Sequence, residues 1–117
     1  MEQSILNTIK KMLGVDSSYD AFDTDIIVAI NTAIFTLTQV GVGPEEGFTI
    51  SGADETWTDF LGDGAQYEAA KTYIYYKAKL AFDPPTSSSV LDAYNKGAEE
   101  YLWRLNVNYE NTKEAVS

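Results

Sequence analysis

Apolar side chains recur every three or four residues in four separate segments of the chain, a spacing that predicts four amphipathic helices. The segments are residues 3–13, 23–40, 65–82 and 90–105. Gly14 and Gly41 follow the first two, and glycine readily takes the left-handed conformation that ends a helix. Asp23 is the expected N-cap of the second helix. Two prolines stop the third, and Ser87–Ser89 offers N-caps for the fourth.

The third segment is apolar on every side of its helix rather than along one stripe. Its large apolar residues are Tyr67, Tyr73, Ile74, Tyr75, Tyr76, Leu80 and Phe82. A helix of this kind needs packing partners on every side. We therefore expect it to lie at the centre of the domain or against another subunit.

The connection between the second and third helices is long and differs in composition. Residues 41–64 hold six of the eight glycines and one of the three prolines. Within this connection, Phe48–Ile50 predicts a short extended piece, and Trp57, Phe60 and Leu61 match one helical turn. A connection of this length inside a compact domain indicates that it has a function.

Together these elements predict one all-α, four-helix domain over residues 1–105, with a loop and short-strand insertion at about 42–64. From Asn106 the sequence turns polar, so residues 106–117 are expected to form a mobile C-terminal tail. The longest apolar run, Ile26–Ile30, is too short to span a membrane. We see no targeting segment, which predicts synthesis and folding in a cytoplasm.

The sequence contains no cysteine and no histidine. This excludes a thiolate nucleophile, a cysteine-ligated zinc or iron–sulfur site, and the commonest general base. An enzyme of this composition would need carboxylates, Lys, Ser or Tyr. Two carboxylates could serve as an acid–base pair, but the acids stand singly in loops and at helix starts, where capping explains them. The oxygen-rich runs at 20–25 and 54–59 lack the glycine and final glutamate of a calcium-binding loop. We therefore expect no catalytic, cofactor-binding or metal-binding residues.

Eighteen acidic and eight basic residues give the chain a net charge of −10. Eleven of the acids lie between Lys11 and Lys71, a stretch that contains no basic residue. Such a surface repels the phosphates of nucleic acids and of anionic lipids. A solvated acidic face that keeps the protein in solution is a competing explanation.

Eight tyrosines, five phenylalanines and two tryptophans exceed what a small helical core usually needs. Tyr and Trp suit subunit interfaces because they bury a large area and keep a polar tip. We expect some of these rings to fill the core and others to contact further subunits. The apolar residues proposed for such contacts are Phe48, Ile50, Trp57, Tyr73, Tyr75, Tyr76 and Trp103.

Three runs of the sequence carry a resemblance to a known family. They are Asp23-x-Asp25-Ile26-Ile27 leading to Ile30-Asn31-x-Ala33, Tyr73-Ile74-x-x-Lys77-x-Lys79-Leu80-x-Phe82-Asp83-Pro84-Pro85, and Glu99-Glu100-Tyr101-x-Trp103-Arg104-Leu105. In this order, over roughly residues 4–105, they resemble the bacteriophage head–tail connector (adaptor) proteins, which dock beneath the portal.

The resemblance implies a four-helix structural protein of the virion with no enzymatic activity and no cofactor. It implies a place at the head–tail junction after synthesis in the host bacterial cytoplasm, and assembly as a ring, usually a dodecamer. The implied partners are further copies of the chain, the portal, and a stopper or tail-completion protein, with no membrane contact. DNA would pass through the ring without specific binding. The candidate channel-facing acids are Glu45, Glu46, Asp54 and Glu55.

The main alternative is an acidic inhibitor that mimics DNA and occupies the nucleic-acid site of another protein. Both interpretations use the net charge of −10. They differ in oligomeric state, because a mimic acts as a monomer or dimer whereas a connector forms a ring. An enzyme, the third class, would need a pocket with convergent carboxylates.

Overall fold

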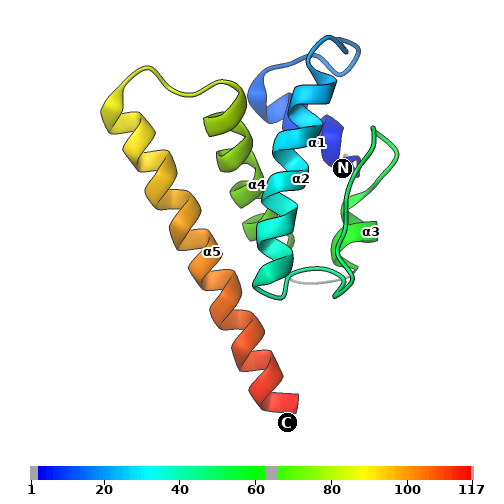
Figure 1. Ribbon diagram of the computed structural model, residues 1–117, viewed down its shortest axis with the longest axis vertical. Coiled ribbons are helices and arrows are strands. Elements are labelled where there is room, and N and C mark those ends of the chain that lie inside the picture. The colour runs from blue at the N-terminus through cyan, green and yellow to red at the C-terminus, as the bar shows by residue number, and fades with distance from the viewer. Residues whose placement is uncertain (1–2, 63–65, 117) are drawn as a thin grey trace.

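The computed structural model describes the backbone of residues 3–62 and 66–116, and the side chains of residues 3–62 and 66–106. Over these residues the chain is all-helical, with four main helices and one short one (Figure 1). The helices are α1 (Ile5–Leu13), α2 (Asp23–Gln39), α3 (Trp57–Leu61), α4 (Tyr67–Phe82) and α5 (Ser88–Val116). The predicted all-α fold with four principal helices is confirmed.

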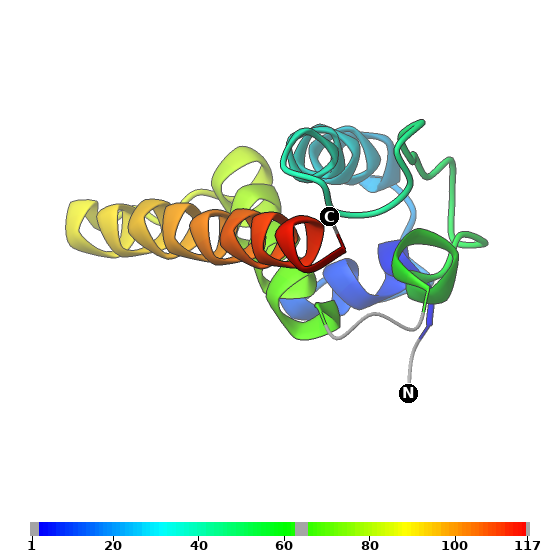
Figure 2. The same cartoon turned by 90° about the horizontal axis from the view of Figure 1, so that it is seen from below.

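Helix α4 occupies the centre of the domain, one of the two positions that its apolar residues on every side predicted. It packs against α1, α2 and α5, which Figures 1 and 2 show arranged around it. Ala70, Ile74 and Ala78 are completely buried, and Tyr73 is nearly so. The two alanines allow neighbouring helices to approach closely, so the burial of α4 joins the other main helices into one core.

Helix α1 ends where its sequence predicts, at Leu13, and begins at Ile5, two residues after the start of the predicted segment. The Ser4 hydroxyl accepts a hydrogen bond from the backbone N–H of Asn7 (3.2 Å), and Gly14 follows the last turn with a φ of 82°. The inner face of the helix buries Ile5 and Ile9 completely. Local capping and burial therefore agree on the bounds of this helix.

The prediction that Asp23 caps helix α2 is wrong. Asp23 is the first residue of the helix, the N-cap position is Phe22, and no side chain caps this end. The Asp23 carboxylate instead lies 2.7 Å from the ammonium of Lys10 in α1. A carboxylate in the first turn still interacts favourably with the positive end of the helix dipole. Asp23 therefore joins two helices rather than closing one.

Lys10 is a buried cation that joins α1 to the start of α2. Only 1% of its side chain is exposed. Besides its ion pair with Asp23, the ammonium donates hydrogen bonds to the backbone carbonyl oxygens of Tyr19 (2.7 Å) and Ser17 (3.2 Å). A buried charge needs such partners because its desolvation costs several kcal/mol. These contacts hold the segment between α1 and α2 against the core.

The insertion between α2 and α3 is attached to α2 by a side chain instead of by a sheet. No β-strand forms in residues 40–62, so the short strand predicted at Phe48–Ile50 is absent. The Ile50 N–H donates to Oδ1 of Asn31 (2.8 Å), and Nδ2 of Asn31 donates to the Ile50 carbonyl (3.0 Å). A side-chain amide offers the same donor and acceptor as a peptide group. Asn31 therefore provides the pairing that a neighbouring strand would supply.

The far end of the insertion is attached to the start of the chain. The Ile5 N–H donates to the Glu55 carbonyl (3.1 Å), and the Trp57 N–H donates to the Gln3 carbonyl (2.9 Å). Helix α3 begins at this point with a reciprocal capping box. The helical turn predicted around Trp57 is confirmed.

The last helix is longer than the sequence pattern predicts. The expected end near Leu105 is wrong, because the backbone stays helical to Val116 and α5 has 29 residues. At a rise of about 1.5 Å per residue, α5 nearly matches the longest dimension of the molecule, 46 Å. Residues 106–116 contain no glycine or proline, so nothing stops the helix where its apolar spacing ends. The mobility predicted for residues 106–117 is untested, and residue 117 lies outside the described residues.

Replacing Lys10 with methionine should lower the free energy of unfolding by about 2–4 kcal/mol. The cause is that Asp23 and two backbone carbonyls lose the partner they have inside the fold. Urea denaturation followed by circular dichroism measures the loss. The neighbouring Lys11 is exposed, and Lys11→Met is the matched control, with an expected change below about 0.5 kcal/mol. Equal losses in both variants would contradict the role given to Lys10.

Replacing Asn31 with alanine should loosen the insertion, at a cost of about 1–3 kcal/mol, since both backbone groups of Ile50 lose their partner. Hydrogen exchange at the Ile50 amide should accelerate, and mass spectrometry or NMR measures its rate. Asn31→Asp keeps an acceptor for the Ile50 N–H but loses the donor to the Ile50 carbonyl. The exchange rate of the Ile50 amide in this variant should therefore lie between those of the unchanged chain and of Asn31→Ala. An unchanged exchange rate in Asn31→Ala would disprove this anchor.

Candidate assembly surface

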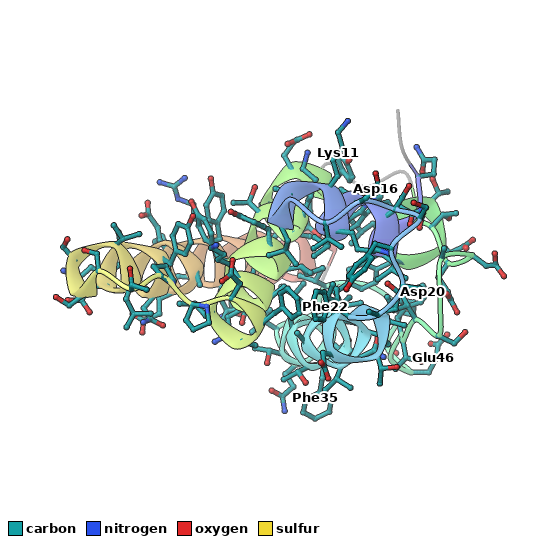
Figure 3. The ribbon with its side chains drawn as sticks, turned by 90° about the horizontal axis from the view of Figure 1, so that it is seen from above. Lys11, Asp16, Asp20, Phe22, Phe35 and Glu46 are labelled. Atoms are coloured by element: carbon teal, nitrogen blue, oxygen red, sulfur yellow. The ribbon has the colours of Figure 1, made fainter. Side chains whose placement is uncertain are left out.

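The net negative charge of the chain is concentrated in residues 12–66. Residues 12–66 carry ten acids and no base, whereas residues 67–117 carry seven acids and six bases. The first group spans α2 and the insertion, and the second spans α4 and α5. Figure 1 shows α5 on the opposite side of the molecule from α3 and the insertion. In Figure 3, Asp16, Asp20 and Glu46 lie on the side away from α5. We call residues 12–66 the acidic half.

The four acids predicted to face a channel have different environments. The exposed ones are Glu45, Glu46 and Asp54. The Glu55 carboxylate accepts hydrogen bonds from the backbone N–H (3.0 Å) and hydroxyl (2.9 Å) of Ser51 and from the N–H of Gly52 (3.3 Å). Partial burial opposes ionisation of Glu55, but these hydrogen bonds outweigh it and lower the pKa of its carboxyl below the ordinary value. Glu55 therefore closes a local turn.

Three of the seven apolar residues proposed for subunit contacts lie in the core of the single chain. Ile50, Trp57 and Tyr73 each have 3% or less of their surface exposed. The Trp57 indole N–H donates to the Thr8 hydroxyl (3.0 Å), and its ring meets Tyr67 edge to face at 5.4 Å between centroids. Packing within one chain accounts for these three residues, which leaves them no surface to offer a second subunit.

Tyr75 and Tyr76 take part in the packing of α4 against α5. Tyr76 stacks on Tyr94 at 5.1 Å between centroids and lies 6.0 Å from the Tyr101 ring. Gly97 of α5 makes room for this ring, because a Cβ there would lie 2.7 Å from Tyr76. The hydroxyls of Tyr75 and Tyr94 are 3.4 Å apart. Both α4 tyrosines stay partly exposed, so their predicted contact with another subunit remains a prediction.

Trp103 is the most exposed of the seven, with 65% of its surface accessible. It stands on α5 next to Arg104, the single arginine of the chain, which forms an exposed ion pair with Glu100 (2.5 Å). Phe48 is partly buried by stacking on Phe60, 5.2 Å between centroids. Among the predicted residues, Trp103 is therefore the one best placed to contact another subunit.

Helix α2 presents an apolar outer face that the sequence pattern did not identify. Val28 and Phe35 are 60% and 64% exposed. They are two turns apart, on the side of the helix opposite the buried Ile26, Ile30 and Ile34. A pair of apolar residues seven apart, outside the main apolar stripe, is the signal that marks such a face.

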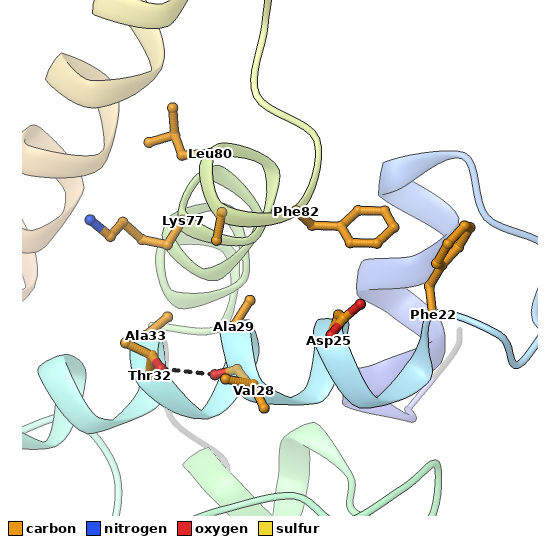
Figure 4. A pocket seen from close by; sticks show the side chains of 10 residues that line it. Phe22, Asp25, Val28, Ala29, Thr32, Ala33, Lys77, Leu80 and Phe82 are labelled. Carbon is orange, nitrogen blue, oxygen red and sulfur yellow. Dashed lines mark hydrogen bonds between the residues drawn. The ribbon is translucent and has the colours of Figure 1, made fainter.

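A groove lies between α2 and α4, and Figure 4 shows the side chains that line it. Its volume is about 790 Å³, and its apolar lining includes Phe22, Val28, Ala29, Ala33, Leu80 and Phe82. The rings of Phe22 and Phe82 meet edge to face at one end, 5.2 Å between centroids. Asp25 and Lys77 also line the groove. Within the described part of the chain, neither belongs to an ion pair.

A second hollow lies between α2 and the insertion. Its volume is about 500 Å³, and Phe35, Phe48, Glu45 and Glu46 are among its lining residues. No basic residue lines it. The two hollows therefore differ in charge, since the α2–α4 groove carries one acid and one base and the second hollow carries acids alone.

No group of three or more acidic side chains in the described residues is arranged to hold a metal ion. Those residues also include no helix that is both long enough and apolar enough to cross a membrane. The features that the described surface offers are thus hollows and exposed apolar or charged side chains.

Comparison with known proteins bears on this surface. A family model described as phage connector protein matches residues 5–112. The match runs from the start of α1 into the last turns of α5, so it includes both hollows and the exposed Trp103. No curated protein and no solved structure gives a significant match.

The hydrogen bond to Tyr94, together with partial burial, raises the pKa of Tyr75 to about 12. The protonated Tyr75 phenol therefore stabilises the folded state. This stabilisation is complete at a pH below the ordinary phenol pKa of 10.0, and it is lost as the pH rises towards 12. Ultraviolet titration should show a late-ionising tyrosine that Tyr75→Phe removes. Tyr94→Phe should shift the ionisation of Tyr75 to lower pH. A titration curve that keeps this late step in Tyr75→Phe would contradict the assignment.

Proposed function

This chain belongs to the phage connector protein family, and we propose that it is a head–tail connector that assembles as a ring on the portal. The ring extends the channel through which DNA passes and provides the docking surface for a stopper or tail-completion protein. The family match over residues 5–112 carries the proposal. The protein then acts in the virion, at the head–tail junction, as a structural component without catalytic activity.

The uneven surface of the chain supports assembly as a ring. Trp103 is exposed on α5, whereas the 790 Å³ groove lies between α2 and α4. Two different patches on one chain favour head-to-tail contacts, and such contacts close into a ring when the rotation between subunits divides a full turn. A single self-complementary patch would instead favour a twofold dimer.

The acidic half suits the wall of a DNA channel. Its ten acids have no basic residue among them, and Glu45, Glu46 and Asp54 are exposed on the insertion. A protein holds DNA by neutralising phosphates with Lys and Arg, so a wall of carboxylates lets DNA pass without adhering. We therefore assign the exposed acids of the insertion to the channel.

The C-terminal part of α5 suits contact with the portal. Figure 1 shows that this end of the helix extends beyond the other helices. A projecting helix reaches a neighbouring component while the core of the domain stays in place. We assign this end of α5 to the portal contact.

The second candidate function, a DNA mimic, rests on the same one-sided charge. A mimic presents carboxylates in place of phosphates to a nucleic-acid-binding protein, and it needs no ring. Family membership favours the connector, and oligomeric state separates the two functions.

Co-expression with the portal protein of the same phage genome tests the connector function. We expect the two proteins to copurify, with a ring of this chain on the portal in electron micrographs and a dodecameric stoichiometry by native mass spectrometry. A portal protein from an unrelated phage is the control and should not bind. A chain that stays monomeric beside the folded portal, and displaces DNA from a nucleic-acid-binding protein, would support the mimic instead.

A further inference from the structure

The groove between α2 and α4 has the shape and lining of a site for a large apolar side chain. Ala29 and Ala33 are small, which leaves a volume of about 790 Å³ between the two helices. Val28 and Phe22 stand exposed among its lining residues. Exposed apolar area beside a groove indicates a surface that a partner covers.

Two charges at this groove have no partner among the described side chains. Asp25 comes from α2 and Lys77 from α4, as Figure 4 shows. Neither belongs to an ion pair or a side-chain hydrogen bond given for the described residues. A partner that fits the groove and also complements these charges would therefore carry one cation and one anion beside an apolar side chain.

Helix α5 of the same sequence carries such a combination. Trp103 is 65% exposed, and the exposed pair of Arg104 and Glu100 stands beside it. An ion pair in water contributes little, so these two charges can exchange partners on docking at small cost. Trp and Arg are also the side chains that most often dominate the energy of an interface.

We propose that, in the ring, the groove of each subunit binds Trp103 of the next subunit. Arg104 of that subunit faces Asp25, and its Glu100 faces Lys77. This inference rests on the proposed connector function and names its subunit contact. In a ring this contact is head-to-tail, because the exposed Trp103 on α5 and the groove between α2 and α4 are different patches of the surface.

The second hollow, between α2 and the insertion, is the less suitable acceptor. It is smaller, at about 500 Å³, and Glu45 and Glu46 are its charged lining residues. It would attract Arg104 but repel Glu100. The α2–α4 groove complements both charges.

Cysteine pairs test the contact cleanly because the chain has no cysteine of its own. Thr32 lines the groove, and Glu99 is an exposed residue one turn before Trp103 on α5. The Thr32→Cys/Glu99→Cys variant, assembled on its portal and treated with a short bis-maleimide, should give a ladder of covalent multimers. The control pair Glu46→Cys/Glu99→Cys probes the second hollow and should give none.

A ladder from the control pair alone would overturn the groove assignment. Rings that form on the portal with no ladder from either pair would overturn this inference and leave the connector function standing. A chain that forms no ring on its portal would overturn both.

Side-chain truncation supplies an independent measurement. Trp103→Ala should weaken association between subunits about thirtyfold, the effect of removing one dominant interface side chain. Phe35→Ala is the matched control, since Phe35 is equally exposed at 64% but does not line the groove. Asp25→Arg and Arg104→Asp should each weaken association, and their combination should restore it. An equal loss of association in Trp103→Ala and Phe35→Ala would count against the proposed contact. So would a combined Asp25→Arg/Arg104→Asp variant that associates no better than the single variants.

Discussion

The packing of α4 against α1, α2 and α5 holds the whole domain together. Ala70, Ile74 and Ala78 are fully buried, and α1, α2 and α5 meet chiefly around this helix. Small residues let the neighbours approach closely, and the large rings of Tyr75 and Tyr76 then fill the space towards α5. Because much of α4 is buried inside the chain, the exposed apolar residues lie mainly on α2 and α5, and the end of α4 contributes Leu80 and Phe82 to the groove beside α2.

Polar side chains hold the connecting segments that lie between the packed helices. Lys10 joins α1, the following segment and α2 through one ammonium, and Asn31 holds the insertion by both backbone groups of Ile50. Each contact lies at a place where regular secondary structure supplies no partner. The smaller hollow beside α2 depends on the attachment of the insertion, since residues 45–49 of the insertion line it.

These features give a connector two distinct sides. The acidic half carries the exposed carboxylates suited to a DNA channel, and the α5 side carries Trp103 and the single arginine. In the proposed ring, this separation of charged surfaces would let one subunit bind its neighbours and still repel DNA. The groove between α2 and α4 is the acceptor that we propose for Trp103 of the next subunit.

The all-α class, the order of the main helices and the helical turn at Trp57 could be predicted from the sequence alone, which left two positions open for α4. These follow from spacing within a helix, which is a local property. The sequence also contains the motifs that resemble the connector family, and the family match confirms that resemblance. The sequence did not reveal that α5 continues to Val116, because apolar spacing reports where packing ends and not where hydrogen bonding ends.

Which apolar residues lie at the surface and which lie in the core depends on how the helices pack. Ile50, Trp57 and Tyr73 are buried, whereas Trp103, Val28 and Phe35 are exposed, although all six are apolar or aromatic. The same holds for charge, since Lys10 is buried and its neighbour Lys11 is exposed. Burial depends on contacts between residues far apart in the chain, such as Trp57 with Thr8, and no local pattern encodes those.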